Sequence, residues 1–521
     1  MTLNRMRGLP DVYPVARRLA LLHGQDRIVS IGPAPIDAAA VVDPRVRLVA
    51  VSPGIHSGRE RPLRPFAEAW SWDVDGPAPP VEPRSLDHAV LICSGILEQI
   101  ADPGPVLQLV QGWLERAPVA IITRRLDDPP GPAPFDIDAA AHLDRFGDLL
   151  ESKGLKPTFL GWTATTAAGR AKTTAMAIVD RVVGSAPAAA PSGFRVTAIM
   201  AVYNESDVVG PAIEALIGDG VLVHVIDNWS TDGTDLIARR YLGRGVIAVE
   251  RFPERPSGTF DLLPLLGRVE EVAAASDTDW VIVHDADERR TPPWAGMSLR
   301  DGLWAVDRSG FSAVDHTVMN FRPVDDGYTP GSSFEDHFPW FEFGTTPDML
   351  LQVKAWRRTP GTVVDLRTTG GHDATFAGRR IFPYKFVLKH YPIRSQEHGE
   401  RKVFVDRGGR WNASERAKGL HVHYDQIVPG QAFLRDPASL ARFDPATGYA
   451  TYLGEIVAGA GLAPDVPPAW ARKGPLRRRL HELGGRLVVG TGLDRRIARA
   501  TGRLPAPIRD RLVRAKRALL G

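Results

Sequence analysis

Acidic and amide side chains recur in three short motifs near the middle of this chain, each directly after a strand-like run. The motifs are AVYNES at residues 201–206, VIDNWSTDGT at 225–234 and VIVHDADE at 281–288. Two carboxylates at positions i and i+2 beyond a buried strand can both reach one hard divalent cation, which keeps its other positions for water and phosphate oxygens. Asp285 and Asp287 have this spacing, so we predict that they hold Mn²⁺ or Mg²⁺.

The Asp-x-Asp spacing alone is a weak signal. It recurs at Asp73/Asp75, Asp136/Asp138 and Asp277/Asp279. An alternative for Asp285 and Asp287 is a turn whose acids cap the next helix. The three motifs taken together favour a ligand site. Open α/β sheets bind ligands beyond the carboxyl ends of their strands, and each motif lies where such a strand should end.

The segments around these motifs alternate between strand and helix, which predicts parallel α/β sheets. The strands expected near the motifs are 195–201, 222–226, 246–249 and 280–284, with helices over 207–217 and after Gly233. An earlier run has expected strands at 27–31, 46–51, 88–93 and 119–123, a helix over 105–115, and closing antiparallel strands at 159–161 and 173–179.

A Pro-, Ala- and Ser-rich segment, GSAPAAAPSG at residues 184–193, separates the two runs and has the composition of a linker. The expected fold class is therefore α/β. We predict two α/β domains, at residues 1–183 and 194–425, followed by a basic, partly helical C-terminal region at 426–521.

Together the three motifs resemble the family 2-like inverting glycosyltransferases of the GT-A fold, over roughly residues 196–425. The resemblance implies a nucleotide-sugar-binding sheet in which Asp227 recognises the nucleotide, while Asp285 and Asp287 carry the metal and the diphosphate. Many relatives have Asp-Gly or Asn-Gly where this chain has Asn228 and Trp229, so contacts to the base and ribose should differ. The remaining donor-binding candidates in the motifs are Tyr203, Asn204, Glu205 and Asp232.

An acceptor hydroxyl must lose its proton as it attacks the anomeric carbon, which calls for a carboxylate base. The segment DGYTPGSSFED at residues 326–336 resembles the acceptor-side loop and base motif of the same family. Asp336 is the first candidate for the base and Glu335 the second. Asp373, within GGHD, is the third candidate.

A basic block, KFVLKHYPIRS at residues 385–395 and then Glu400-Arg-Lys402, resembles the HYPxRS…RK segment of a bacterial subgroup of the family. The resemblance suggests His390 as a further metal ligand. Arg394, Arg401 and Lys402 are candidates to hold phosphates of the nucleotide-sugar donor. A lone histidine is more often structural, and the pair His421 and His423 is more simply explained as one face of a strand.

The first domain resembles a different fold. Residues 91–103, LICSGILEQIADP, look like the fourth-strand region of class I methyltransferases, which implies a methyltransferase-like Rossmann-type sheet. A methyl-donor site needs a glycine turn after the first strand and a carboxylate after the second. The chain has other residue types at these places: Ser30, Pro33, Pro35 and Ser52. We therefore predict a fold of this kind that binds no methyl donor.

Charge is distributed unevenly along the chain. Between Arg472 and Arg517 fifteen Lys and Arg face three acids, a net charge of +12, which leaves −9 for the rest of a chain whose total is +3. An acidic body with a basic end does not indicate a general nucleic-acid binder. Apolar stripes at 476–487 and 508–519 predict basic amphipathic helices, which fit either an anionic membrane surface or the acidic body.

Cys93 is the single cysteine, so no intramolecular disulfide is possible. Neither a signal peptide nor a run of apolar residues long enough to cross a bilayer is evident. These features predict a cytoplasmic protein, either free or on the inner face of the membrane.

The leading hypothesis is a metal-dependent inverting glycosyltransferase that moves a sugar from a nucleotide-sugar donor to a glycan or lipid-linked acceptor, in bacterial surface glycan synthesis. Two alternatives stay open: a methyltransferase or bifunctional enzyme, and a non-catalytic scaffold docked on a membrane.

Overall fold

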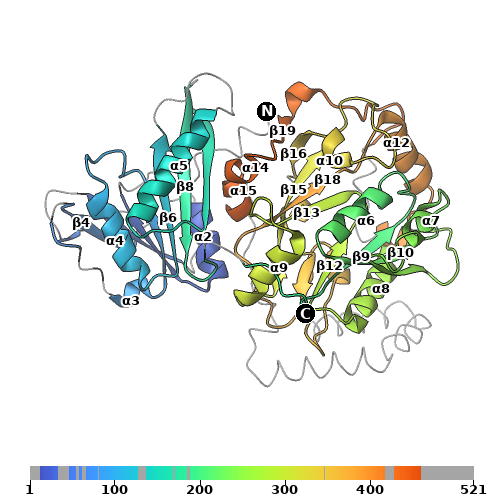
Figure 1. The fold of residues 1–521 in the computed structure, drawn as a ribbon, viewed down its shortest axis with the longest axis horizontal. Coiled ribbons are helices and arrows are strands. Elements are labelled where there is room, and N and C mark those ends of the chain that lie inside the picture. The colour runs from blue at the N-terminus through green and yellow to red at the C-terminus, as the bar shows by residue number, and fades with distance from the viewer. Residues whose placement is uncertain are drawn as a thin grey trace, which may run out of the picture.

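The computed structural model describes residues 12–32, 46–53, 58–60, 66–74, 76–79, 81, 83–126, 137–167, 170–184, 188–344, 347–416 and 427–458. These residues form two α/β domains that lie side by side, the first up to residue 184 and the second from residue 188 onward (Figure 1). The predicted α/β class is confirmed. No helix in the described ranges has the length and apolar character needed to cross a membrane. The pair His421 and His423 and the two basic helices predicted near the C-terminus lie outside these ranges.

The first domain is built on an eight-stranded sheet with the order β3-β4-β2-β1-β5-β6-β8-β7. Its strands are β1 (Arg27–Ile31), β2 (Arg47–Pro53), β3 (Gly58–Glu60), β4 (Glu68–Trp72), β5 (Ala89–Cys93), β6 (Val119–Leu126), β7 (Phe159–Ala167) and β8 (Arg170–Asp180). Strands β4, β2, β1, β5 and β6 are parallel, whereas β8 runs antiparallel to both β6 and β7. The predicted closing antiparallel pair is thus confirmed.

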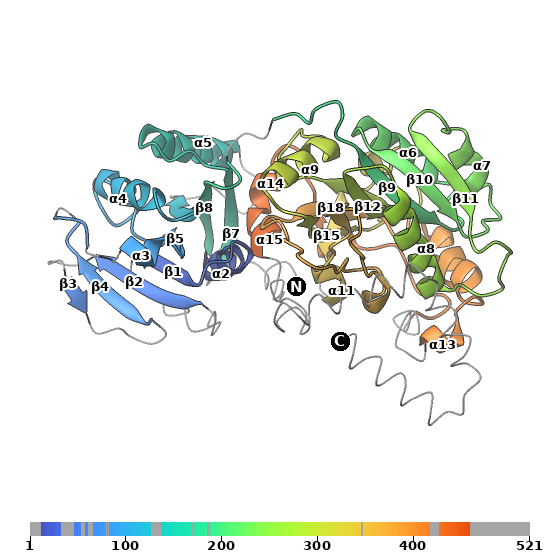
Figure 2. The same cartoon turned by 90° about the horizontal axis from the view of Figure 1, so that it is seen from below.

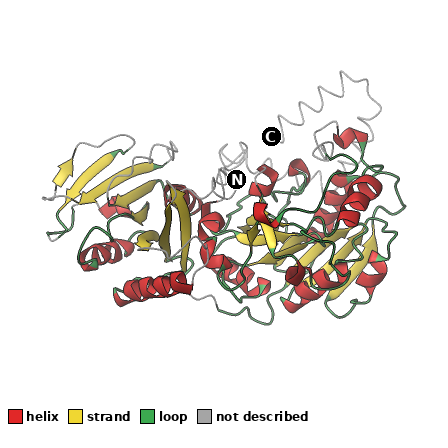
Figure 3. Ribbon diagram, turned by 90° about the horizontal axis from the view of Figure 1, so that it is seen from above, coloured by secondary structure: helices red, strands yellow, loops and turns green. Residues whose placement is uncertain are grey.

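Helices cover both faces of this sheet, as Figure 3 shows. They are α2 (Val12–Leu22), α3 (Pro83–Leu86), α4 (Gly104–Leu114) and α5 (Ile137–Ser152). Successive side chains of a strand point to opposite faces. Accordingly, Ile28 of β1 joins the buried cluster that contains α2, while Val29 joins the cluster that contains α4. Burial on both faces explains why all five residues of β5 are apolar.

The backbone of Gly32 after β1 lies close to that of Ser94 after β5. Ser94 donates its backbone N–H to the carbonyl of Ile31 (3.1 Å), and Gly32 donates to the carbonyl of Val51 (2.9 Å). A Cβ on Gly32 would lie 2.1 Å from the backbone oxygen of Ser94, so not even a methyl group fits there. Doubly wound sheets bind their ligands at this point, where the strand order reverses.

The second domain contains a six-stranded sheet with the order β11-β10-β9-β12-β17-β14. Its strands are β9 (Val196–Val202), β10 (Leu222–Asp227), β11 (Val246–Arg251), β12 (Trp280–His284), β14 (Ala313–Val314) and β17 (Ala355–Arg357). The four strands predicted around the motifs are present, and β11, β10, β9 and β12 are parallel. The helices in this part of the chain are α6 (Val209–Gly218), α7 (Thr234–Arg239), α8 (Leu262–Ala275) and α9 (Leu299–Arg308).

A second sheet in this domain was not expected from the sequence. It has the order β13-β18-β15-β16-β19 and consists of β13 (Glu288–Thr291), β15 (His316–Phe321), β16 (Trp340–Phe343), β18 (Phe386–His390) and β19 (Ala441–Arg442). The short elements around it are α10 (Phe334–His337), α11 (Pro347–Leu350), η2 (Arg367–Thr369), α12 (Gln396–Glu400), the π-helix η3 (Arg401–Arg407), α13 (Ala413–Arg416), η5 (Pro437–Ser439), α14 (Gly448–Thr451) and α15 (Leu453–Ala458). Strand β19 pairs with β16, so a segment after residue 425 contributes a strand to this sheet.

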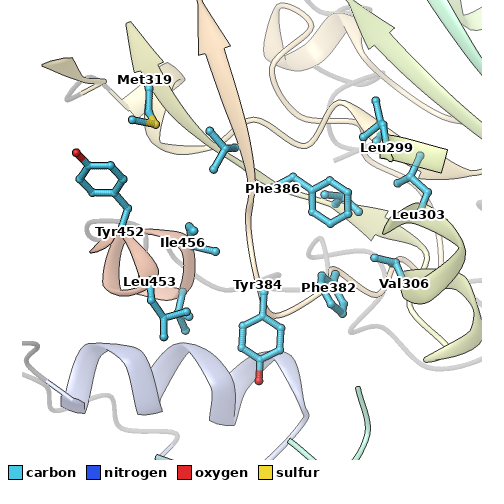
Figure 4. Close-up of a cluster of buried hydrophobic side chains, with 14 of the residues drawn as sticks. Leu299, Leu303, Val306, Met319, Phe382, Tyr384, Phe386, Tyr452, Leu453 and Ile456 are labelled. Carbon is cyan, nitrogen blue, oxygen red and sulfur yellow. The ribbon is translucent and has the colours of Figure 1, made fainter. Parts of the chain in front are cut away.

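Helices α14 and α15 lie between the two domains (Figure 2). A Cβ at Gly161 of β7 would lie 2.2 Å from the backbone oxygen of Ala450, so the glycine permits close contact between β7 and α14. One buried apolar cluster runs through both domains, and Figure 4 shows Tyr384, Leu453 and Ile456 within it, beside α2. The ring centroids of Phe159 and Tyr384 are 4.3 Å apart across this interface.

Buried polar contacts complete the interface. Asp315 of the second domain forms ion pairs with Arg18 of α2 (3.2 Å) and with Lys385 (2.9 Å). The Tyr384 hydroxyl donates to Asp180 of β8, and the ring of His23 contacts the same carboxylate at 2.9 Å. A buried polar group is costly without its partner, so these pairs fix how the two domains meet.

The residue types after β1 and β2, among them Pro33, Pro35 and Ser52, lead to a prediction about the first domain. Full-length protein titrated with S-adenosylmethionine should show no binding with a dissociation constant below about 1 mM, a binding free energy of about −4 kcal/mol. Calorimetry on the intact chain measures this directly. Micromolar affinity would contradict the prediction and restore the bifunctional alternative.

Candidate active site

The three acidic motifs meet at one edge of the six-stranded sheet. Strand β9 lies between β10 and β12 and is parallel to both, with Val202 in register with Asp227 and Met200 in register with His284. The exits of β9, β10 and β12 are therefore neighbours, as the sequence predicted. The strand order reverses around β9, which is where sheets of this kind bind ligands.

Asp227 ends β10 and is fully buried. It accepts a hydrogen bond from the backbone N–H of Ser230 (3.1 Å), and the Nε of Arg251 is 3.6 Å from its Oδ2. Burial raises the pKa of Asp227, and the bonds from Ser230 offset this only in part. A buried carboxyl at a strand exit, with one basic side chain nearby, is suited to reading polar groups of a ligand.

Asp232 holds two of the motifs together. Its carboxylate accepts from the backbone N–H of Ser206 (3.0 Å) and from the hydroxyl of Thr234 (2.6 Å). Burial opposes ionisation, but these hydrogen bonds outweigh it and lower the pKa of Asp232. The residue predicted to bind the nucleotide-sugar donor thus has its oxygens engaged by the protein and ties the β10 exit to the β9 exit.

Two non-glycine residues in these exits have positive φ, Asn204 (53°) and Trp229 (62°). The amide of Asn204 donates to Asp406 (2.8 Å) and accepts from the backbone N–H of Thr231 (2.9 Å). Next to it, the guanidinium of Arg410 lies 3.7 Å from the ring centroid of Tyr203. Asn204 therefore contacts the β10 exit, and Tyr203 contacts Arg410, a basic residue far away in the sequence.

Asp285 and Asp287 follow β12 in different surroundings. The Asp285 side chain is 46% exposed and lies 3.1 Å from the Nζ of Lys354. Asp287 is buried, with the Nζ of Lys402 at 2.8 Å. Burial would raise the pKa of Asp287, but the positive charges of Lys402 and Arg394 outweigh burial and hold that pKa well below its ordinary value. Asp287 is therefore ionised at neutral pH.

Glu288 is a buried acid that anchors this turn. Its carboxylate pairs with Arg290 (2.6 Å) and accepts from the backbone N–H of Asp285 (3.0 Å). Burial raises the pKa, but Arg290 and Lys354 outweigh it and bring the pKa of Glu288 to about 2. The buried ion pair of Glu288 and Arg290 thus stabilises the turn that carries Asp285 and Asp287.

His390, the third predicted metal ligand, lies beside Asp287. Its Nδ1 lies 2.9 Å from the side-chain oxygen of Asn320, which can only accept, so the ring proton is on Nδ1. Burial lowers the pKa of His390 and keeps the ring neutral. The lone pair is then on Nε2, which lies 3.9 Å from Oδ2 of Asp287. A histidine that ligates a metal commonly donates its other ring N–H to such a partner.

The predicted metal ligands Asp285, Asp287 and His390 do not form one compact triple. Within the described part of the chain, the side chains with ligand atoms all within 4.8 Å of one another are Glu205, Asp207 and His398. Those atoms already surround the guanidinium of Arg394. Asp287 and His390 fit a divalent cation by their chemistry, whereas the more exposed Asp285 lies beside Lys354.

Arg394 is fully buried and directs its N–H groups to protein atoms. They reach Asp207 at 2.6 Å, Glu205 at 2.6 Å and the carbonyl of Tyr391 at 3.1 Å. These carboxylates raise the pKa of Arg394 against the effect of burial. Arg394 therefore stabilises the β9 exit. Its N–H groups bind protein atoms, so the structure does not present them to a phosphate.

Lys402 links two of the exits. Its Nζ lies 2.8 Å from Oδ2 of Asp287 and 2.8 Å from Oε1 of Glu205. The lysine is on the π-helix η3, a rare geometry that is frequent at functional sites. Its neighbour Arg401 is 45% exposed and lies 3.4 Å from Asp406.

The three candidates for the base have different surroundings. Glu335 is paired with Arg289 (3.0 Å) and Lys389 (2.7 Å), which overcome burial and lower its pKa. Asp336, the next residue on α10, is exposed, and its backbone N–H donates to Ser333 at the start of that helix. Asp373 forms an ion pair with Arg379. Asp336 is thus the candidate whose carboxylate is most accessible.

Sequence reasoning missed several basic residues of the site. Lys354 pairs with Asp285, Arg251 approaches Asp227, and Arg410 donates to Asn228 (2.9 Å). Each comes from a segment far from its partner in the chain and belongs to none of the motifs. Only the folded sheet brings them together.

No protein-family model and no curated protein matches the chain. Among solved structures, S. aureus TarS 1-349 in complex with UDP is 17% identical over 27% of this chain and 39% of its own, with a TM-score of 0.18. Glucosyl-3-phosphoglycerate synthase from Mycobacterium tuberculosis, in complex with Mn²⁺, UDP and glucosyl-3-phosphoglycerate, is 22% identical over 24% of this chain and 45% of its own, with a TM-score of 0.18. The matches span less than half of either chain. A likeness with such TM-scores supports no conclusion about function.

The position of Arg394 yields a stability prediction. Arg394→Met leaves buried acids without their partner, so the free energy of unfolding should fall by about 3 kcal/mol or more. The matched control is Arg401→Met, which removes a partly exposed arginine nearby and should stay within about 0.5 kcal/mol of the unmutated protein. Urea denaturation compares the three proteins. Equal losses in both variants would contradict a special structural role for Arg394.

Proposed function

We propose that the second domain transfers a sugar from a nucleotide-sugar donor to an acceptor hydroxyl with the help of a divalent cation, as a glycosyltransferase. The observation that carries this proposal is the meeting of three strand exits around β9. The buried carboxyl of Asp227 lies after β10 on one side of β9, and Asp287 lies after β12 on the other. His390 of β18 lies beside Asp287, and Lys402 bridges Asp287 and Glu205.

Each side of this arrangement suits one part of a nucleotide sugar. Asp227, with Arg251 nearby and Tyr203 on the adjoining exit, supports recognition of the nucleoside. Asp287 and His390 would hold Mn²⁺ or Mg²⁺, with Asp285 as a further acid at the mouth of the site. When bound, the cation stabilises the negative charge that builds on the departing diphosphate. Lys402 lies beside Asp287 and supplies a positive charge for the same phosphates.

The acceptor side rests on α10. Glu335 of this helix forms ion pairs with Arg289 of β13 and Lys389 of β18. These two paired strands also contain Glu288 and His390. We assign Glu335 a positioning role, because two cations engage its carboxylate. Asp336 then takes the proton from the acceptor hydroxyl as that oxygen bonds to the anomeric carbon and the bond to the diphosphate breaks. A base placed opposite the leaving group gives inversion at this carbon.

The first domain is proposed to be a methyltransferase-like fold that has lost its cofactor and serves to position the second. The strand order β4-β2-β1-β5-β6 with antiparallel β8 supports the fold, and Pro33, Pro35 and Ser52, where a methyl donor needs glycines and a carboxylate, support the loss. The acceptor proposed is a glycan or lipid-linked sugar of a bacterial surface polymer, with the basic C-terminal tail on the inner face of the membrane.

The two aspartates after β12 give the first test. Asp285→Asn and Asp287→Asn should each abolish the metal-dependent binding of a nucleoside diphosphate, because each loses a charge at the cation. Both proteins should stay folded by circular dichroism. Calorimetric titration with Mn²⁺ present and then chelated measures the effect. Unchanged affinity in both variants would remove the metal assignment.

The base gives the second test. Asp336→Asn should retain binding of the nucleotide-sugar donor while lowering the rate of transfer by about 10²-fold or more. Asp373→Asn is the comparison, since that carboxylate is paired with Arg379 and should affect transfer less. If Asp373→Asn loses transfer and Asp336→Asn does not, the base is Asp373.

A further inference from the structure

Trp229 has a backbone conformation that its side chain disfavours. Within the ranges that the structure describes, Asn204 and Trp229 are the non-glycine residues with positive φ. Asparagine visits this region readily because its short polar side chain bonds locally, but a bulky aromatic residue there is an outlier. Such strain persists only where surrounding contacts offset it, and it concentrates at ligand sites.

The surroundings of Trp229 show what holds it. Its indole N–H donates to the carbonyl of Pro253 (2.8 Å), and the guanidinium of Arg251 lies 4.9 Å from its ring centroid. Asn228 donates to the carbonyl of Phe252 (2.9 Å). Two successive side chains thus grip the turn after β11. Trp229 is only partly buried.

The ring lies on the nucleoside side of the proposed site. Arg251 connects it to Asp227, since the same guanidinium group that covers the indole approaches Oδ2 of Asp227 at 3.6 Å. The phosphate-facing residues Asp287 and Lys402 belong to other exits and make no contact with Trp229 among those described. An aromatic face in this place can stack on a base, and such stacking is a strong contribution from one side chain.

We propose that Trp229 is a specificity-determining residue whose indole ring contacts the base or ribose of a nucleoside diphosphate. This inference rests on the proposed function and names the part of the ligand that Trp229 reads. The competing account is that Trp229 only fastens the turn at Pro253. The two accounts differ in whether the ring or its N–H matters.

The test compares three variants of the full-length protein by calorimetry. Trp229→Asn and Trp229→Gly adopt positive φ easily but lack a ring, whereas Trp229→Phe keeps a ring without the N–H that reaches Pro253. The probes are nucleoside diphosphates and inorganic pyrophosphate, each with Mn²⁺. In Trp229→Asn and Trp229→Gly the affinity for the nucleoside diphosphate should fall about tenfold or more. In Trp229→Phe it should fall by no more than about threefold, and pyrophosphate affinity should not change in any variant.

Each other outcome decides the matter. Unchanged nucleoside diphosphate affinity in Trp229→Asn and Trp229→Gly would overturn the inference. So would an equal loss in Trp229→Phe, which would show that the N–H to Pro253 matters and the ring does not. A parallel loss of pyrophosphate affinity would place the effect on the phosphates. If the unmutated protein binds no nucleoside diphosphate, the proposed function fails together with the inference. If it binds one and the Trp229→Asn and Trp229→Gly variants bind it equally well, the inference fails alone.

Discussion

Charge neutralisation at the exits of β9 and β12 is the constraint on which the site depends. Glu205, Asp207 and Asp287 are acids at these exits, and like charges in so small and dry a space repel strongly. Arg394 and Lys402 make their coexistence possible, the first by engaging Glu205 and Asp207, the second by bridging Glu205 and Asp287. The basic block and the acidic motifs are therefore one electrostatic unit.

The same principle extends beneath the site. Glu288 pairs with the fully buried Arg290, and Lys354 reaches both Glu288 (3.4 Å) and Asp285. These ion pairs form a buried charged layer next to the turn that carries Asp285 and Asp287. They also account for the charged sequence of β13, ERRT. At the domain interface, Asp315 with Arg18 and Lys385 repeats the arrangement, so that buried acids matched to cations fix both the site and the contact between domains.

The strands with mostly apolar residues could be predicted from the sequence. The strand that buries charged side chains could not. Strands such as β9 and β12 consist mostly of apolar residues, and the polar residues after them predict a ligand-binding edge. Strand β13, with the sequence ERRT, has buried Glu288 and Arg290, which no rule of hydrophobic alternation predicts. The partners of the acids could not be predicted either, because Lys354 and Lys402 come from distant segments. The position of Trp229 was visible as a departure from the motif, but its positive φ and its contacts with Arg251 and Pro253 required the structure.

The most direct test of the account is a calorimetric panel in which the unmutated full-length protein is titrated with the common nucleoside diphosphates, with Mn²⁺ and again with a chelator. The proposed function predicts micromolar binding of one nucleoside diphosphate that is lost when the cation is removed, because Asp287 and His390 are proposed to hold the diphosphate through the metal. Absence of binding across the whole panel in the presence of Mn²⁺ would contradict it.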